Sequence, residues 1–278
     1  MLRQRILTAL LLIPPLVAAL FYLPPSGVAA LLGLFIAAAA WEWGALIGLA
    51  RPWPRLAYVL ALMLTGTAGV AVVLRDPGFL PAYLSAVVLF WLWAFYELAR
   101  GGGVHKSMFA WRPAKLASGF LILVPAWQAA VYLHAHDPRS PASLLFLFVL
   151  VWAADTGAYL FGHLFGRTRL APAVSPGKTV EGVVGGVGTV MVLAYLAGTL
   201  VWEFTPRLTM LWVVLAAVTA LFSVVGDLVE SKFKRLAGVK DSGALLPGHG
   251  GVLDRIDALT AAAPVFALGW LFLFKSSA

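Results

Sequence analysis

The chain has 278 residues, of which 62% are hydrophobic and 12% are charged, and its formal charge is +8. A soluble domain carries about twice this share of charged residues, and its buried strands rarely exceed about eight apolar residues in a row. Apolar runs of about 18 to 24 residues recur here, a length that crosses a membrane as a helix. The absence of cysteine excludes disulfides, thiol catalysis and cysteine-ligated metals.

Nine apolar segments are predicted to span a membrane, which makes the fold class an all-α polytopic helical bundle. The first follows two arginines like a secretory signal, but it is longer than a signal and two prolines follow it instead of a cleavage site, so we expect it to be retained. In chain order the predicted spans are Ile6–Leu23, Val28–Ala50, Leu56–Leu74, Leu80–Leu98, Leu116–His134, Ser143–Phe161, Val180–Trp202, Leu208–Val229 and Leu259–Phe274.

Positive charge predicts the orientation of these spans. Sixteen of the 20 Lys and Arg residues lie before the first span or in the loops after spans two, four, six and eight, and the others lie at the opposite ends. Because cytoplasmic loops carry an excess of Lys and Arg, the N-terminus is predicted to be cytoplasmic and the C-terminus extracytoplasmic. Such a basic face attracts anionic lipids and nucleotides, whereas the sequence contains no recognisable nucleic-acid-binding module.

The chain is expected to form a single membrane domain, with ordinary hydrophobic helices in residues 1–142 and the chemistry in residues 143–278. Two polar loops, residues 162–179 and 230–258, are predicted on the cytoplasmic side and contain acids and bases together. The segment Gly182–Gly186 contains a GxxxG pair, which usually marks a close helix contact. No inverted repeat typical of transporters is recognisable.

Four carboxylates fall inside predicted spans, where an acid costs about 2.5–3.5 kcal/mol to insert and is a functional candidate. Glu97 has Arg100 three residues later, so a local ion pair explains it. For Asp155 we favour a functional role. For Glu42 a structural polar contact and a role in the site are equally supported. Asp227 is the strongest candidate because of the residues that follow it.

The eighth span is predicted to leave the membrane with an acid, a hydroxyl and a base on one face. Asp227 and Ser231 are four residues apart and Lys234 is three further on, a spacing that aligns side chains on a helix. Glu230, three residues from Asp227, is the alternative partner.

More acids follow the turn Pro247–Gly251 (PGHGG), which is expected to reverse the chain. Asp254 and Asp257 come next, so these two residues and Asp227 are predicted to meet as three carboxylates. Hard oxygen ligands in that number suit Mg²⁺, and two such ions can hold the oxygens of a phosphoryl displacement. His249 in the turn is interpreted either as a phosphate donor or as a backbone-bonded turn residue.

The first polar loop contains Ser175–Thr179 (SPGKT), which looks like the end of a phosphate-binding P-loop. The motif fails, because Pro172 stands where its first glycine belongs and no strand is expected before it. Lys178 is still a candidate to bind phosphate as a point charge. The alternative is a lysine that extends from the membrane border towards water.

The motifs of the second polar loop resemble the signature of the phosphatidate cytidylyltransferase family. The similarity covers 27 residues with fixed spacing and continues upstream through Asp155–Tyr159 and Ser175–Gly182, whereas the amino-terminal half is similar in layout only. Relatives often have a basic residue at Gly177 and tryptophan at Val180. The segments that carry the resemblance are Ser231–Arg235 (SKFKR), Lys240–Gly243 (KDSG), Leu246–Val252 (LPGHGGV) and Asp254–Asp257 (DRID).

The resemblance implies an all-helical membrane enzyme that is often a homodimer and has a polar cavity reaching from the cytoplasm into the membrane. A divalent metal would be bound by Asp227, Asp254 and Asp257, with Ser231 and Lys234 beside it as further catalytic candidates. The expected cofactor is Mg²⁺, with room for a second cation.

The implied reaction is a nucleotidyl transfer from CTP to phosphatidic acid, which gives CDP-diacylglycerol and pyrophosphate for phospholipid biosynthesis. Positioning and charge stabilisation dominate such transfers. The candidates to bind substrate are Lys178, Lys240, His249 and Arg255, together with Lys234. The expected location is the inner (cytoplasmic) membrane, with the site facing the cytoplasm and membrane lipids as partners. The alternatives are a CTP-dependent lipid kinase and a cation transporter that relays through intramembrane acids.

Overall fold

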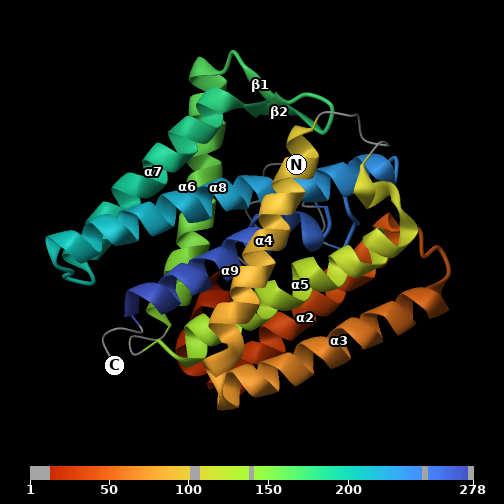
Figure 1. Cartoon of the computed structure of the whole chain (residues 1–278), viewed down its shortest axis with the longest axis horizontal. Helices are drawn as coiled ribbons and strands as arrows, with labels where there is room; N and C mark the ends of the chain where they lie inside the picture. Colours follow the sequence, from red (N-terminus) through yellow and green to blue (C-terminus); the bar gives the residue numbers. More distant parts are fainter. Residues whose placement is uncertain (1–12, 101–106, 138–140, 246–249, 275–278) are drawn as a thin grey trace.

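The computed structural model describes residues 13–100, 107–137, 141–245 and 250–274 (Figure 1). Within these ranges eight helices are long and apolar enough to cross a membrane, and a shorter apolar helix covers Ile13–Tyr22. The eight are α2 Pro25–Leu46, α3 Pro52–Arg75, α4 Leu80–Ala99, α5 Arg112–Ala135, α6 Ala142–Phe165, α7 Val180–Leu200, α8 Pro206–Leu236 and α9 Leu253–Phe274. The predicted class, an all-α polytopic bundle, is confirmed.

Each of the eight helices corresponds to one predicted span, and the remaining one, Ile6–Leu23, is described only in part. The largest differences are at the polar ends of the last two helices. α8 continues to Leu236 instead of ending at Val229, and α9 begins at Leu253 instead of Leu259. Hydropathy ends a span at the first charged residues, whereas a helix continues for as long as its backbone hydrogen bonds are made. The candidate site residues on these segments are therefore helical.

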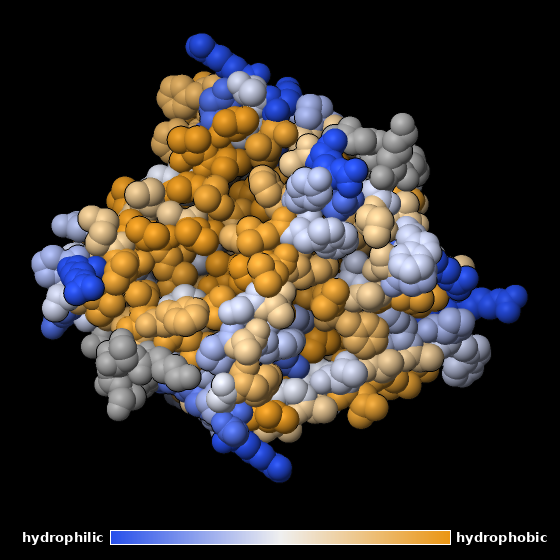
Figure 2. All heavy atoms as spheres, in the orientation of Figure 1, coloured by the Kyte–Doolittle hydropathy of each residue, from blue (hydrophilic) through white to orange (hydrophobic). Residues whose placement is uncertain are grey.

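Apolar side chains face outward as well as inward. The face in Figure 2 is mainly hydrophobic over the middle of the helices, and strongly hydrophilic residues gather at its periphery. Large apolar side chains are exposed on α3, α4, α6, α7 and α8, whereas a soluble protein exposes only small contiguous apolar patches. The protein is therefore a multi-pass membrane protein.

α5 is the most buried of the eight long helices, and Figure 1 shows it beside α2 and α3. Trp127 of α5 packs against Gly33 of α2 and Gly66 of α3, where any side chain would collide with the indole ring. The indole Nε1 donates a hydrogen bond of 2.9 Å to the carbonyl oxygen of Ala29. Glycines thus let three helices approach one large aromatic side chain.

The GxxxG pair of α7 lies directly against α6. A Cβ atom at Gly182 would lie 2.7 Å from the carbonyl oxygen of Ala158, and one at Gly186 would lie 2.6 Å from that of Ala154. The predicted packing role of this pair is confirmed. This close contact fixes both ends of the polar segment that joins the two helices.

That polar segment forms a two-stranded antiparallel hairpin, with β1 at Arg169–Ala171 and β2 at Ser175–Thr179. The expectation that no strand stands before the SPGKT sequence was therefore wrong. The short strands carry no alternating apolar pattern, which is the signal that identifies a strand in a sequence. Pro172 still breaks the P-loop pattern. Lys178 lies on β2 and not in a phosphate-binding loop.

The hairpin is held at its base and at its turn. Glu181 accepts hydrogen bonds of 3.1 Å from the backbone N–H groups of Arg167 and Thr168. Arg235 of α8 donates through Nε to the carbonyl oxygen of Val174, at 3.1 Å. These contacts fix β2 relative to the polar end of α8.

Candidate active site

Three carboxylates from α8 and α9 form the centre of the candidate site. One oxygen atom from each of Asp227, Glu230 and Asp257 lies within 4.8 Å of the others. The two helices meet closely because Gly226 has no side chain, and a Cβ atom there would lie 2.6 Å from the carbonyl oxygen of Asp257. Glu230 is only 3% exposed. Like charges this close repel each other, so a cation among them is favourable.

Ser231 and Lys234 continue the same face of α8, as their spacing predicts. The hydroxyl of Ser231 donates to Asp227 Oδ1 at 3.2 Å. One turn further on, Lys234 Nζ lies 2.6 Å from Glu230 Oε2 and 2.8 Å from Asp254 Oδ1. The ammonium group therefore joins an acid of α8 to an acid of α9.

Asp254 is engaged differently from the other two predicted metal ligands. Its carboxylate accepts hydrogen bonds from the backbone N–H groups of Gly251 at 2.8 Å and Ser242 at 3.0 Å, in addition to the pair with Lys234. Both N–H groups belong to the segment before α9, so the carboxylate of Asp254 ties this segment to the start of the helix. The group of acids within reach of one ion, in the described part of the chain, contains Glu230 in its place.

A further acid, Glu42 of α2, fixes the turn that leads into α9. Its buried carboxylate accepts hydrogen bonds from Leu253 N at 2.8 Å, Val252 N at 3.1 Å and Ser242 Oγ at 3.0 Å. A side chain at Gly251 would collide with this carboxylate. Negative charge is favourable at a helix N-terminus, where N–H groups lack partners. Of the two roles expected for Glu42, the structure shows the structural contact.

The hairpin brings Lys178 to the acids of α8. Its Nζ forms an ion pair with Asp227 Oδ2, and both side chains are about a quarter exposed. Asp155 of α6 lies in the same region, within electrostatic range of Lys178, Asp227 and Arg255. Segments that are distant in the sequence thus contribute charged groups to one place. The Lys178 ammonium is directed to an acid instead of extending alone towards water.

The remaining candidates lie at the margin of this cluster or outside it. Lys240 and Asp241 are exposed in the segment between α8 and α9. Arg255 is exposed on the first turn of α9, where it also lines an apolar cavity. His249 lies outside the described residues.

Two residues of the site were underestimated from the sequence. Glu230 was only an alternative partner for Asp227, although a three-residue spacing places side chains on one helix face as well as a four-residue spacing does. Glu42 carried a signal in the cost of burying an acid in a membrane span. That cost predicts that a partner exists, but not that the partner is a turn about 200 residues later.

The site combines acids that can hold a cation with lysines that can bind phosphate. Cations with carboxylate ligands and positively charged side chains are the recurring components of enzymes that transfer phosphate-containing groups. The fold and the site together define an integral membrane enzyme of this class.

The chain belongs to the cytidylyltransferase family, whose profile it matches over residues 3–273. A protein of Pseudomonas aeruginosa named phosphatidate cytidylyltransferase is 42% identical over 270 residues, which cover 96% of each chain. One of Haemophilus influenzae with the same name is 38% identical over 299 residues, which cover 98% of this chain and 100% of that relative. One of Staphylococcus saprophyticus is 41% identical over 58% of this chain and 61% of its own length.

Proposed function

We propose that this protein transfers the cytidylyl group of CTP to phosphatidic acid and releases CDP-diacylglycerol and pyrophosphate, a step of phospholipid biosynthesis. Membership of the family and two relatives of matching length that are named for this activity support the proposal. The observation that carries it is the ion pair between Lys178 and Asp227 beside two more acids. This pair joins a phosphate-binding type of residue to a cation-binding type at the polar end of membrane helices.

A divalent cation would be held by Asp227, Glu230 and Asp257. Their oxygens are hard ligands, and with separations of up to 4.8 Å one oxygen from each can reach a single ion after a small contraction. We favour Mg²⁺, which takes few carboxylates and keeps positions for phosphates, and a second cation on the family resemblance alone. When bound, the metal would offset charge on the reacting phosphates. Asp254 would position Lys234 instead of binding this ion.

In the reaction, a phosphate oxygen of phosphatidic acid attacks the α-phosphorus of CTP. The bond from that phosphorus to the bridging oxygen breaks, and its electron pair leaves with pyrophosphate. Lys178 and Lys234, whose charges now neutralise acids, would turn to the triphosphate and hold it in line. Ser231 would keep the carboxylate of Asp227 oriented. Further contacts to the substrates are proposed for Lys240, Arg255 and His249.

The proposed location is the inner membrane, with the acids facing the cytoplasm where CTP is present. The distribution of basic residues supports this orientation. A homodimer is proposed on the family resemblance alone, and no nucleic acid is expected as a partner.

The test is a product analysis with purified protein, phosphatidic acid, Mg²⁺ and CTP labelled at the α-phosphorus. The proposal predicts label in the lipid phase and one pyrophosphate released per labelled lipid. Release of CDP with unlabelled phospholipid would identify a lipid kinase. Cation uptake into vesicles without nucleotide, together with no transfer of label, would identify a transporter.

A further inference from the structure

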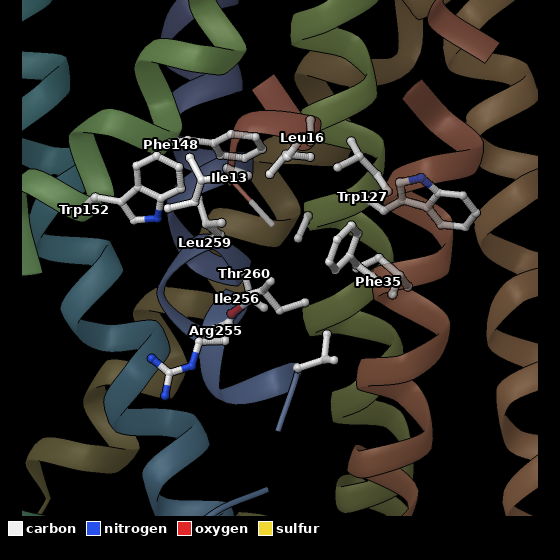
Figure 3. Close-up of a pocket in the computed structure, with 16 residues that line it drawn as sticks. Ile13, Leu16, Phe35, Trp127, Phe148, Trp152, Arg255, Ile256, Leu259 and Thr260 are labelled. Carbon is white, nitrogen blue, oxygen red and sulfur yellow. The ribbon is translucent and has the colours of Figure 1, made fainter. Parts of the chain in front are cut away.

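An apolar cavity of about 300 Å³ lies beside the candidate active site. It is formed by the Ile13–Tyr22 helix, α2, α5, α6 and α9. α9 contributes a stripe of residues from Arg255 to Ala263, which is about 12 Å long at the rise of a helix, and Val252 just before α9 extends it. Figure 3 shows Phe35, Trp127, Phe148 and Trp152 around the cavity. Its lining is apolar except for Arg255 and Thr260.

The polar end of this cavity meets the candidate active site. Arg255 belongs to the first turn of α9, between the two acids at Asp254 and Asp257. Figure 3 shows its guanidinium group turned away from the apolar side chains. Thr260, which also lines the cavity, donates through its hydroxyl to the carbonyl oxygen of Asp257 at 2.5 Å. A molecule in the cavity whose anionic end reached Arg255 would therefore present that end to the acids and lysines of the site.

We infer that this cavity binds one acyl chain of the lipid substrate while Arg255 binds its phosphate group. The inference rests on the proposed function and adds a binding site to it. The occupant must be slender, flexible and apolar along its length, because it lies between helices against aliphatic and aromatic side chains. It must also be anionic at one end, because a guanidinium group binds phosphate with two parallel hydrogen bonds.

The cavity selects the lipid by shape. An acyl chain that leaves the bilayer for the cavity exchanges one apolar environment for another, so little hydrophobic free energy is gained. A cavity of fixed length instead distinguishes chains by steric fit, and one methylene group too many in a hydrophobic pocket changes specificity by about 10–200-fold. Chain-length preference is therefore the property that reports on the cavity.

The test fills the cavity with Ala263→Leu and compares dioleoyl with dihexanoyl phosphatidic acid under the same micelle conditions. We expect the ratio of kcat/KM for the long over the short substrate to fall about tenfold or more, with the KM for CTP unchanged. The matched control is Ala68→Leu on the exposed side of α3, which should keep the wild-type ratio. If Ala263→Leu folds and keeps that ratio, the inference is wrong, although label still transferred to lipid would leave the proposed function intact.

A second measurement does not depend on turnover or on a variant that folds. Phosphatidic acid with a photoreactive diazirine in one acyl chain is irradiated with the wild-type protein, and the labelled peptides are mapped. The inference predicts labelling of α9 at Leu259 and of α6 at Trp152, and protection by excess dioleoyl phosphatidic acid. Labelling confined to outward-facing residues such as Leu64 and Val184 would overturn it.

Discussion

Replacing Glu230 with glutamine tests which acids hold the metal. Glu230→Gln keeps the size of the side chain but removes one of three carboxylates within 4.8 Å of one another. Lys234 Nζ loses its partner at 2.6 Å but keeps Asp254 Oδ1 at 2.8 Å, so the cost of about 3–5 kcal/mol for a fully unpaired buried charge is avoided. The variant should therefore fold. Loss of a preorganised charge should lower kcat about 10²-fold.

The matched comparison is Asp254→Asn. This variant leaves the three acids in place but weakens the contacts to Lys234, Gly251 and Ser242. We expect lower thermal stability and a reduced rate, with a Mg²⁺ requirement close to that of the wild type. For Glu230→Gln, the Mg²⁺ concentration at half-maximal rate should rise about 10–100-fold, the loss of metal affinity typical when a residue that supports a metal site is replaced.

The assay measures transfer of α-labelled CTP to lipid against Mg²⁺ concentration for both variants. Asp241→Asn serves as the control, because Asp241 is exposed and outside the cluster. The reasoning is refuted if Asp254→Asn shifts the Mg²⁺ requirement more than Glu230→Gln does. In that case the trio expected from the sequence, and not the one that meets in the structure, would hold the ion.

Three further predictions concern substrate binding, helix positioning and orientation. Lys178→Ala should raise the KM for CTP at least about tenfold with little change in the KM for lipid, and Lys178→Arg should restore it only in part; unchanged kinetics in both would remove this lysine from the site. Glu42→Gln leaves at least one donor of the α9 turn unsatisfied, so we expect a lower melting temperature and a kcat reduced about tenfold, and wild-type values for both would contradict the positioning role. A reporter fused after Ala278 should read as extracytoplasmic, and a cytoplasmic signal would reverse the proposed placement of the site.

The helical architecture could be predicted because the membrane imposes a simple length rule. A run of about 20 apolar residues is required to span hydrocarbon, and each of the eight long helices was found where such a run occurs. Contacts within one helix could also be predicted from the sequence, since the hydrogen bond from Ser231 to Asp227 follows from a four-residue spacing. The GxxxG pattern also predicted a close helix contact at Gly182 and Gly186, but it did not predict that the partner is α6.

Contacts between segments that are distant in the sequence could not be predicted in this way. The choice between Glu230 and Asp254 as the third acid depends on which backbone donors surround Asp254 at the start of α9. Glu42, which lies on another helix, holds the residues around those donors through bonds from the Ser242 hydroxyl and the Val252 N–H group. The hairpin that positions Lys178 has strands of three and five residues, too short for a periodic pattern. Each of these features depends on tertiary packing that no local pattern encodes.

The most direct test of the account is the rate of cytidylyl transfer by Asp227→Asn. Asp227 contacts the hairpin through Lys178, belongs to the acid cluster and accepts a hydrogen bond from Ser231, so every component of the proposed site meets at this carboxylate. The measurement is the transfer of α-labelled CTP to phosphatidic acid at saturating substrates and Mg²⁺, with folding checked by thermal melting. The account predicts a rate about 10² or more below that of the wild type, with the protein still folded. A folded Asp227→Asn variant that transfers label at the wild-type rate would contradict it.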